Sequence, residues 1–459
     1  MHAAVPPQRA DLSARELRTL RGLTAELIDA CPDAIAERRR FDGIRLRATV
    51  VAEHELRAWL AGKKVLVTGG TGCVGSVLLA ELARFGAGQL WSLSRGVTTG
   101  WPVVDQVSYL RADVRDRADL TQAIRSVQPD IVFHLAAQRD PGLAEYEVVR
   151  TVHTNLIGTS NVVSSCADSG VAELICATTG KALRPYSRSI YTAGKRTAEW
   201  ALASAAAYTG MKVSASRFTH VVDNSIIGCR LETWTESGVI RIHDPDVGFY
   251  VQSALESAQL MLNAGVRARP GRLEVTAVSD LGWPVSLLEL AVGTLEARAS
   301  CTPIYFSGYD PGYEQVAFPA LYDPMTAGDF SPLLNAFEAA SADRAVGLEI
   351  DVCTLVLDLG QVDPRLLPQL EKACVNNDPR AVRDGLDELS RQVFDAALAP
   401  LPVGVLRRAI ALASQYEAKL GADHAFMLAG LRRHLSLSAA VDSQRAVEVG
   451  VAQEPAVWV

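Results

Sequence analysis

The sequence lacks the features that mark membrane, secreted and nucleic-acid-binding proteins. No apolar run approaches the ~18 residues that span a bilayer, and the opening stretch MHAAVPPQRADLSARE has no apolar core of the kind a secretory signal needs. The eight cysteines are scattered without a CxxC pair, so we expect reduced thiols, no metal site and a cytoplasmic location. A net charge of −7 over 459 residues gives no reason to expect nucleic acid or a membrane surface as a partner.

The stretch from Lys64 to Gly75, KVLVTGGTGCVG, is the most informative part of the chain. It predicts a buried strand and a glycine-rich turn, and residues 76–85 then keep an apolar face at helical spacing. This order places backbone N–H groups and a helix N-terminus against a phosphate. Gly69 suits unusual backbone angles, Gly72 a close approach to a pyrophosphate, and Gly75 close helix–strand packing. The predicted dinucleotide-binding turn comprises Gly69, Thr71, Gly72, Cys73, Val74 and Gly75.

Beyond this turn, apolar stretches alternate with helical patterns. The expected strands are residues 89–94, 107–110, 131–135, 173–178 and 212–217. Such alternation predicts an α/β fold with a Rossmann-type, doubly wound parallel sheet. We expect a helical N-terminal extension (1–60), a dinucleotide-binding domain (61–220), a smaller α/β substrate-binding portion (221–330) and a helical C-terminal extension (331–459).

The C-terminal extension has one clear helix signal. Asp378 is placed to cap a helix with Pro379 in its first turn, and apolar residues then recur on one face. The extension is either a helical appendage that packs on the catalytic domain or on a second subunit, or a lid or partner-recognition module.

Ligands of such sheets bind beyond the carboxyl ends of the strands. After the second strand, Ser94 is followed by Arg95, where an acidic residue would hold a 2′-hydroxyl. The arginine favours the 2′-phosphate of NADP, with NAD still possible. Asp113 would either hydrogen-bond an adenine amine or cap a helix. Small residues follow the fourth strand, where a cofactor passes close. The predicted cofactor contacts in these two places are Val114, Leu135, Ala136 and Ala137.

A second pattern, YTAGK, brings a phenol and an ammonium together. Tyr191 and Lys195 lie four residues apart and would share one helix face. The lysine would lower the pKa of the phenol, so that it exchanges a proton with a substrate hydroxyl. Thr179, at the end of the fifth strand, could hold the same substrate oxygen. A lone YxxxK is a weak signal, but here it follows the glycine turn in the required order.

These pieces together resemble the extended short-chain dehydrogenase/reductase superfamily, and within it the nucleotide-sugar dehydratase and epimerase branch of polysaccharide biosynthesis. The matching segments are GKKVLVTGGTGCVGSVLL, LSRG, RADVRD, PDIVFHLAAQ, TNLIGTSNV, TTGKALRP, YTAGKRTAE and FSGYDPG. The resemblance covers about residues 45–325. It implies that Tyr191 and Lys195 also contact the dinucleotide and that Asn155 underpins the site. It further implies that the chain forms a homodimer through the helix bearing Tyr191.

Three departures from that branch bear on the reaction. The resemblance implies an aspartic acid, the general acid of water elimination, where Gly180 stands. Lys181 is retained and could remove a proton next to a ketone if burial lowers its pKa. Asp310 replaces an arginine expected near a diphosphate, and would repel that group. His220 stands where relatives usually have asparagine.

Three functions remain open at this stage. The first is NADP-dependent transient oxidation of a ring hydroxyl on a nucleotide-linked sugar, giving epimerisation or 4,6-dehydration. Its catalytic set would be Thr179, Lys181, Tyr191 and Lys195. The second is a net NADP-dependent dehydrogenase or reductase of a specialised-metabolite polyol or ketone. The third is a cofactor-binding scaffold that has lost catalysis.

Overall fold

A single large sheet forms the centre of the molecule. Its strands are β1 (Lys64–Thr68), β2 (Gln89–Ser94), β3 (Val107–Arg111), β4 (Ile131–His134), β5 (Glu173–Thr179), β6 (Lys212–Phe218), β11 (Leu273–Val278), β14 (Asp343–Ala345) and β15 (Ile350–Leu355). They lie in the order β14-β15-β11-β6-β5-β4-β1-β2-β3. The structure is a computed structural model that describes all residues except 2, 97–99, 314–329, 416–420 and 452–459.

The parallel part of this sheet confirms the predicted fold class. Strands β1 to β6 fall within one or two residues of the expected ranges, and they pair in parallel with β11 added beside β6. The order 3-2-1-4-5-6 is that of a doubly wound sheet, in which the chain starts in the middle and builds outward both ways. The reversal of direction between β1 and β4 leaves a crevice at their carboxyl ends.

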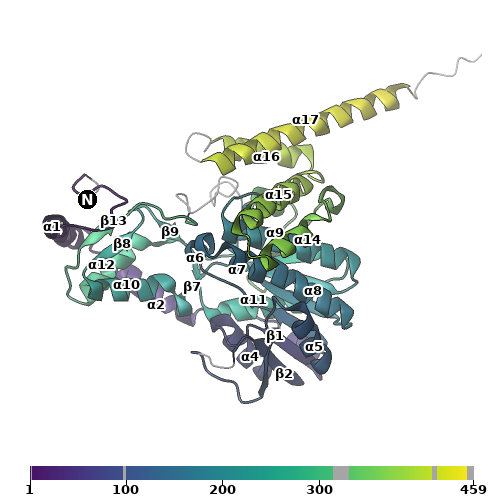
Figure 1. Cartoon of the computed structure of the whole chain (residues 1–459), viewed down its shortest axis with the longest axis horizontal. Coiled ribbons are helices and arrows are strands. Elements are labelled where there is room, and N and C mark those ends of the chain that lie inside the picture. Colours follow the sequence, from purple (N-terminus) through teal and green to yellow (C-terminus); the bar gives the residue numbers. More distant parts are fainter. Residues whose placement is uncertain (2, 97–99, 314–329, 416–420, 452–459) are drawn as a thin grey trace, which may run out of the picture.

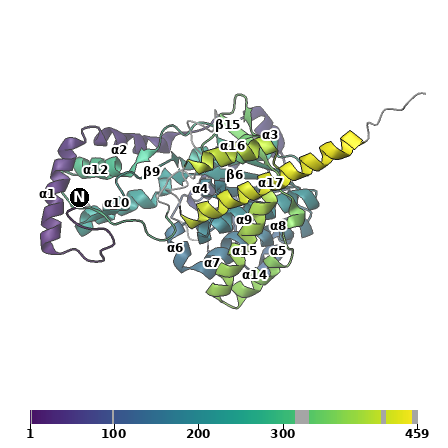
Figure 2. The same ribbon diagram turned by 90° about the horizontal axis from the view of Figure 1, so that it is seen from above.

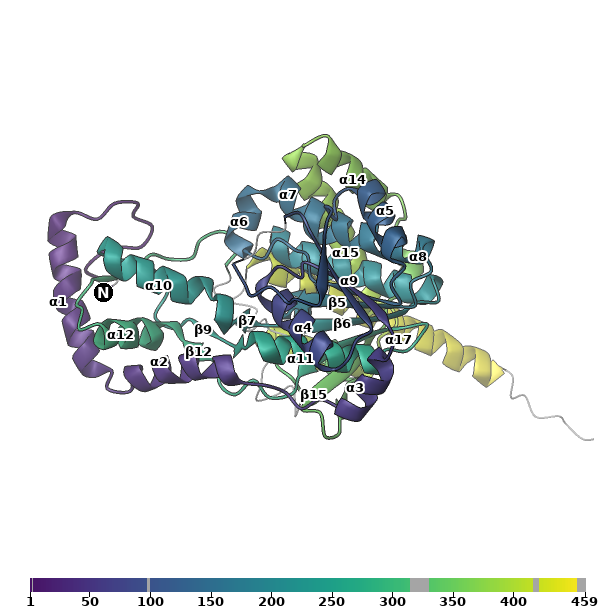
Figure 3. The same ribbon diagram turned by 90° about the horizontal axis from the view of Figure 1, so that it is seen from below.

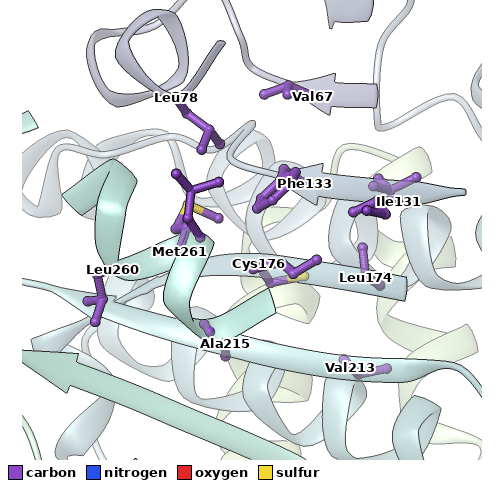
Figure 4. Packing of buried hydrophobic residues seen from close by; sticks show 14 of the residues in the cluster. Val67, Leu78, Ile131, Phe133, Leu174, Cys176, Val213, Ala215, Leu260 and Met261 are labelled. Carbon is purple, nitrogen blue, oxygen red and sulfur yellow. The ribbon is translucent and has the colours of Figure 1, made fainter. Parts of the chain in front are cut away.

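Helices cover both faces of the sheet. One face carries α3 (Glu53–Leu60), α4 (Cys73–Arg84) and α11 (Ala254–Arg267), and the other carries α5 (Arg117–Val127), α8 (Gly158–Asp168) and α9 (Ile190–Tyr208). Figure 4 shows side chains of α4 and α11, among them Leu78 and Met261, gathered with those of the central strands. The strands read as continuous apolar runs because both of their faces are buried.

The predicted helical C-terminal extension also contains two strands, which the sequence analysis did not predict, within residues 343–355. Here β15 pairs antiparallel with β11, and β14 pairs antiparallel with β15. The reason lies in β11, which is buried along its whole length. Its outer edge would otherwise leave backbone N–H and C=O groups without partners. The last part of the chain therefore completes the central sheet.

The remaining C-terminal elements are helical, as expected. They are α13 (Ala336–Ala339), α14 (Leu366–Val375), α15 (Pro379–Leu398), α16 (Val403–Ser414) and α17 (Ala422–Val451). The predicted helix start is confirmed, because Asp378 accepts hydrogen bonds from the first amides of α15. Figures 1 and 2 show α17 running past the body of the molecule. Among the described helices, none combines the length and apolar character that crossing a bilayer requires.

The helix α15 packs on α9, the helix through which the resemblance implies dimerisation. Its apolar stripe is buried against α9 and α7 (Val148–Val152), and 16 of the 19 residues of α9 are buried. The buried residues of the stripe are Val382, Leu386, Leu389 and Val393. A second subunit could reach the part of α9 beneath this stripe only by displacing α15. Homodimerisation stays a prediction, and the part of α9 that α15 covers is not free to form the interface.

A smaller lobe lies at one end of the sheet, and Figure 3 shows it apart from the sheet and its helices. Its helices are α1 (Ala14–Ala30), α2 (Ala34–Gly43), α10 (Ile226–Ser237) and α12 (Leu287–Ala297), and its strand pairs are β8 (Ile240–Ile242) with β13 (Ile304–Phe306), and β9 (Gly248–Phe249) with β12 (Val285–Ser286). A further pair, β7 (His220–Val221) with β10 (Val251–Gln252), lies where the two lobes meet. The N-terminal helices are part of this lobe, since α2 packs along α12.

One buried histidine gives the fold a testable pH dependence. His134, at the end of β4, lies between the hydroxyls of Thr68 (2.7 Å) and Thr159 (3.1 Å). Burial, with the nearby Lys195 charge, lowers the pKa of His134 from 6.5 to about 3. As the pH falls below 6.5, His134 therefore binds a proton in the unfolded chain but not in the folded chain. The folded state should lose about 2 kcal/mol between pH 7 and pH 5 from this group.

Urea unfolding of His134→Gln measures this contribution. The variant should lose about 2 kcal/mol less than the wild type over the same pH interval. His54→Gln, at an exposed position on α3, is the control and should keep the wild-type slope. Equal slopes in wild type and His134→Gln would contradict the prediction.

Candidate functional site

The glycine turn joins β1 to α4 at the carboxyl edge of the sheet. Gly69 has a φ of +76°, and a Cβ atom there would lie 2.7 Å from the backbone nitrogen of Ala136. A Cβ on Gly75 would collide with the Gly69 carbonyl. Gly72 is the N-cap of α4 and supplies no side-chain acceptor for the first amides of the helix. Those amides, including that of Val74, fit a pyrophosphate, and only glycine fits the close contacts at the turn.

The predicted contacts from neighbouring strands lie along the same edge. Gly69 donates a backbone hydrogen bond to Leu93 of β2, and Leu135 donates one to Thr68 of β1. Arg95 follows β2 and is exposed. The other residues of this edge are Thr71 and Cys73 in the turn, Ser94 at the end of β2, Val114 after β3, and Ala137 after β4. The structure therefore brings the predicted cofactor contacts to one place.

Asp113 forms an ion pair with a neighbouring arginine, and its predicted contact with an adenine amine stays a prediction. It does not cap α5, because Asp116 does so. Its carboxylate instead accepts three side-chain hydrogen bonds from Arg115, the shortest at 2.6 Å. Burial alone would raise the pKa of Asp113, but Arg115 outweighs burial and the pKa is lowered. The carboxylate is thus ionised and held beside Arg95.

The predicted catalytic residues meet at the ends of β5 and α9. The hydroxyl of Tyr191 hydrogen-bonds the side chain of Thr179, and both side chains line one cavity together with Lys181. Lys195, one turn further along α9, is buried near His134 and Cys176. Burial lowers the pKa of Lys195 to about 8. Its titration therefore falls close to neutral pH.

The expected lowering of the phenol pKa is not what this geometry gives. Burial raises the pKa of Tyr191 to about 12, against the opposing effects of its bond to Thr179 and of the Arg139 charge. The desolvation of a phenolate outweighs these stabilising contacts. Tyr191 is therefore a neutral phenol at pH 7, with a proton to donate.

Asn155 supports the loop that follows β4. It lies in a π-helical turn, His153–Ile157, between α7 and α8. Its side-chain oxygen accepts the amide of Gln138 (2.8 Å), and its side-chain nitrogen donates to the Gln138 carbonyl (2.9 Å). The paired bonds fix the backbone just beyond Ala136 and Ala137, as the resemblance implies for a residue beneath the site.

A cavity of about 370 Å³ opens above Tyr191, between the two lobes. Its walls come from the ends of β5 and β6, from α10, and from the strands of the smaller lobe. Five basic side chains and one acidic side chain, Asp246, line it among the described residues. The basic residues are Arg139, Lys181, Arg184, Arg230 and Arg241. This charge balance favours an anionic ligand. No cluster of metal-ligating side chains occurs in the part of the chain that the structure describes.

Comparison with known proteins identifies the family. Residues 65–316 match the family described as polysaccharide biosynthesis protein. The chain belongs to this family. The probable polysaccharide biosynthesis protein EpsC of Bacillus subtilis is 26% identical over 280 residues, which are 57% of this chain and 46% of that protein. A UDP-N-acetylglucosamine 4,6-dehydratase (inverting) of Campylobacter jejuni is 30% identical over 175 residues, 37% of this chain and 51% of the relative.

The chain spans about half the length of these curated relatives. Among solved structures, Pen from Bacillus thuringiensis aligns with 64% of this chain and 88% of its own, with a TM-score of 0.54 at 21% identity. That similarity shows the shared fold. The resemblance to the nucleotide-sugar branch of the extended short-chain dehydrogenase/reductase superfamily is confirmed.

Gly180 lies under a residue that sequence reasoning missed. A Cβ atom at position 180 would lie 2.6 Å from Cδ2 of Leu333. Leu333 belongs to the segment before α13, and it lines the cavity with Pro332. The space that an acidic side chain would need at this position is therefore filled by a methyl group. The expected acid is thus absent at position 180, and Leu333 occupies the space that its side chain would have taken.

A buried network of charges holds Leu333 in position. Arg217 of β6 is fully buried and donates to the Leu333 carbonyl (2.8 Å), to Glu338 (2.6 Å) and to Glu199 (2.7 Å). Arg196 donates to Glu338 as well (2.9 Å). Burial would raise the pKa of Glu338, but the two arginines outweigh burial and the pKa is lowered. The segment carrying Leu333 is thus bonded to the strand and helix that form the site.

The second and third departures have different outcomes. Asp310 is exposed and does not line the cavity, so its charge does not face the position of a ligand there. His220 lines the cavity and contacts the Ser225 hydroxyl at 2.7 Å. Burial lowers the pKa of His220 to about 4, so its imidazole is neutral at pH 7. The motif containing Asp310 continues into residues 314–329, which lie outside the described residues. The same residues are the last part of the predicted substrate-binding portion.

Sequence reasoning also missed the aromatic and basic side chains of the smaller lobe. His243 stacks on Tyr309 with ring centroids 5.4 Å apart. The ring centroid of Tyr313 lies 4.8 Å from that of His243. Arg241 is held by the carbonyls of Arg9 (3.0 Å) and Ala10 (2.9 Å) in the N-terminal segment. The tyrosines stand within the FSGYDPGY motif, which was the available signal. The arginines of the cavity had no signal in the sequence, because the segments that carry them meet only in the folded chain.

Proposed function

We propose that this chain is an NADP-dependent enzyme of the short-chain dehydrogenase/reductase type that acts on a sugar nucleotide by transient oxidation of a ring hydroxyl. The observation that carries the proposal is the position of Tyr191 and Thr179 at the floor of a basic cavity, next to the glycine turn. The Campylobacter jejuni relative, whose name gives a UDP-N-acetylglucosamine 4,6-dehydratase, supports a nucleotide-sugar substrate.

The residues divide into three roles. Gly69, Gly72 and Gly75 would hold the pyrophosphate of the dinucleotide against α4, and Lys195 would hold its other half near the ends of β4 and β5. When bound, the dinucleotide supplies hydride transfer. Thr179 would orient the substrate hydroxyl. Tyr191 would take the proton of that hydroxyl in its phenolate form, which is a minor fraction at pH 7, and would return the proton when the ketone is reduced.

Substrate binding draws on the cavity walls. The five basic side chains would neutralise a diphosphate, with Arg230 and Arg241 coming from the smaller lobe. Stacked His243 and Tyr309 offer an aromatic surface for a base. Arg230, Arg241 and this aromatic surface lie in the smaller lobe, so a sugar between them and Tyr191 would bridge the two lobes.

The reaction proposed is epimerisation rather than loss of water. Gly180 has no proton to donate to a leaving hydroxyl, and Leu333 fills the space beside it. General acid assistance typically supplies about 10²- to 10⁴-fold, so elimination without it should be slow. Lys181 lines the cavity and remains the candidate for removing a proton next to a ketone. The same absence of an acid favours a second candidate function, a net dehydrogenase or reductase that stops at the ketone.

Mass spectrometry of sugar nucleotides incubated with the purified full chain and NADP tests these proposals. No change in mass, with inversion seen by NMR, supports epimerisation. A change of two hydrogens with stoichiometric NADPH supports the net redox reaction, and loss of water overturns the role given to Gly180 and Leu333. Cofactor binding with no turnover on any sugar nucleotide would point instead to a scaffold.

The choice of NADP makes a prediction at the end of β2. Arg95→Ala should weaken NADP binding by about 10- to 100-fold, because a hydrogen-bonded charge pair to the 2′-phosphate contributes roughly 1.5–3 kcal/mol. NAD binding should change little. Isothermal titration calorimetry with both dinucleotides measures the difference. Arg125→Ala, at an exposed position on α5, should leave both affinities unchanged, and an unaltered NADP affinity in Arg95→Ala would contradict the preference.

A further inference from the structure

The loop that leads into α9 is bonded to the C-terminal helices. We define the entry loop as residues 184–189, between the 3-10 turn Gly180–Leu183 and the start of α9. The hydroxyl of Tyr186 donates to Asp387 of α15 (2.6 Å), and the backbone amide of Arg188 donates to Asp423 of α17 (2.8 Å). Two helices from beyond residue 378 thus supply carboxylates to a loop that lies more than 190 positions earlier in the chain.

An aromatic cluster reinforces these bonds. The ring of Tyr186 lies 4.3 Å from that of Phe426 on α17 and 6.4 Å from that of Phe394 on α15. The guanidinium of Arg391 lies 4.4 Å above Phe426 and also donates to Asp387 (2.9 Å). The side chain of Tyr186 is therefore buried on its aromatic face and bonded at its hydroxyl.

The first amide of α9 is bonded to α6 and, through α6, to α15. Ser189, the N-cap of α9, makes no side-chain capping bond. The amide of Ile190 instead donates to Glu145 (2.8 Å) of α6 (Pro141–Tyr146). Arg383 of α15 holds that carboxylate at 3.0 Å. A carboxylate at this end of the helix satisfies an amide that has no partner within the helix.

The consequence concerns Tyr191, which is the second residue of α9. Its hydroxyl must reach Thr179 and the cavity, so the direction of the first turn of α9 sets where the proton is delivered. We propose that α15 and α17 are a positioning element of the active site, in which Asp387 and Asp423 hold the entry loop so that Tyr191 faces its substrate. This inference rests on the proposed function. It assigns α15 and α17 a part in catalysis without contact with the substrate.

Variants at Asp423 test the positioning role. Asp423→Ala removes the acceptor for the Arg188 amide and should lower kcat about tenfold with KM unchanged, because sub-ångström misplacement of a catalytic group costs about one to two orders of magnitude. Asp423→Asn keeps an oxygen acceptor and should retain most of the wild-type kcat. The matched control is Asp395→Ala, which removes an α15–α17 bond to Arg433 (2.6 Å) that does not touch the entry loop.

A readout independent of turnover separates this inference from the proposed function. Hydrogen exchange of the peptide covering residues 184–190 should be faster in Asp423→Ala than in wild type, Asp423→Asn or Asp395→Ala. Unchanged kcat in Asp423→Ala, or an equal loss in Asp395→Ala, overturns the positioning role. If the wild type turns over no sugar nucleotide, the proposed function fails, and unchanged exchange in Asp423→Ala would then overturn the positioning role as well.

Discussion

Replacing Tyr191 with phenylalanine should lower kcat by about 10²- to 10⁴-fold, the range typical of a lost general acid–base group. The substitution removes one oxygen from a buried side chain whose ring packs among residues of α6, α7 and α15, so the fold should persist. With its pKa raised to about 12, the Tyr191 phenol holds its proton at pH 7, and no other group in this position replaces it. NADP affinity should stay near the wild-type value, since the glycine turn is untouched.

Turnover of the sugar nucleotide and calorimetric titration of NADP together measure this prediction. Tyr208→Phe is the matched control, because Tyr208 ends the same helix and is 77% exposed. That variant should keep full activity. Near-normal turnover in Tyr191→Phe would refute the catalytic role of the phenol, and a parallel loss of NADP binding would show that the substitution acts on the fold.

Removing Arg217 should destabilise the folded chain by about 3–5 kcal/mol, the cost of leaving a buried charge without its partner. Arg217→Ala would leave Glu199 and Glu338 buried with only Arg196 between them, and it would free the carbonyl of Leu333. The side chain of Arg217 has no exposed area, so solvent cannot replace its bonds. The cost should appear as a lower midpoint of urea unfolding.

An ion pair of similar geometry at the surface provides the control. Arg365 also forms a forked contact with a carboxylate, that of Asp363, at 2.8 and 3.0 Å, but its side chain is 79% exposed. Arg365→Ala should leave the unfolding midpoint nearly unchanged, because exposed ion pairs contribute little. Similar losses in the two variants would show that burial does not decide the effect. Arg217→Lys, which keeps a charge without the planar fork, should fall between wild type and Arg217→Ala.

The features that sequence reasoning recovered are local in the chain. The glycine turn follows from a few adjacent residues, and the relation of Tyr191 to Lys195 follows from helical spacing. The alternation of strand and helix predicted the sheet because each βα unit is contiguous. The predicted capping by Asp378 needed only the neighbouring Pro379. In each case the physical cause lies within one or two elements.

The features that it missed join distant parts of the chain. Leu333 reaches Gly180, and Glu338 reaches Arg217 from 121 positions away. Neither contact has a signal in spacing or composition, because each depends on where the sheet places its strand ends. The strand β15, IDVCTL, is short and apolar, and such a run does not by itself distinguish a strand from part of a helix. The raised pKa of Tyr191 likewise depends on burial that only the folded chain supplies.

The late position of β15 and Glu338 in the chain has a consequence for synthesis in the cell. A nascent chain that has emerged up to residue 330 already contains the glycine turn and the Tyr191–Lys195 pair. It still has an open edge on β11 and an arginine, Arg217, that lacks one of its two carboxylates. Exposed strand edges of this kind attract other chains and chaperones. We therefore expect the pocket to mature only after residues 331–355 have left the ribosome, and chains that stop before these residues to be bound by chaperones and degraded.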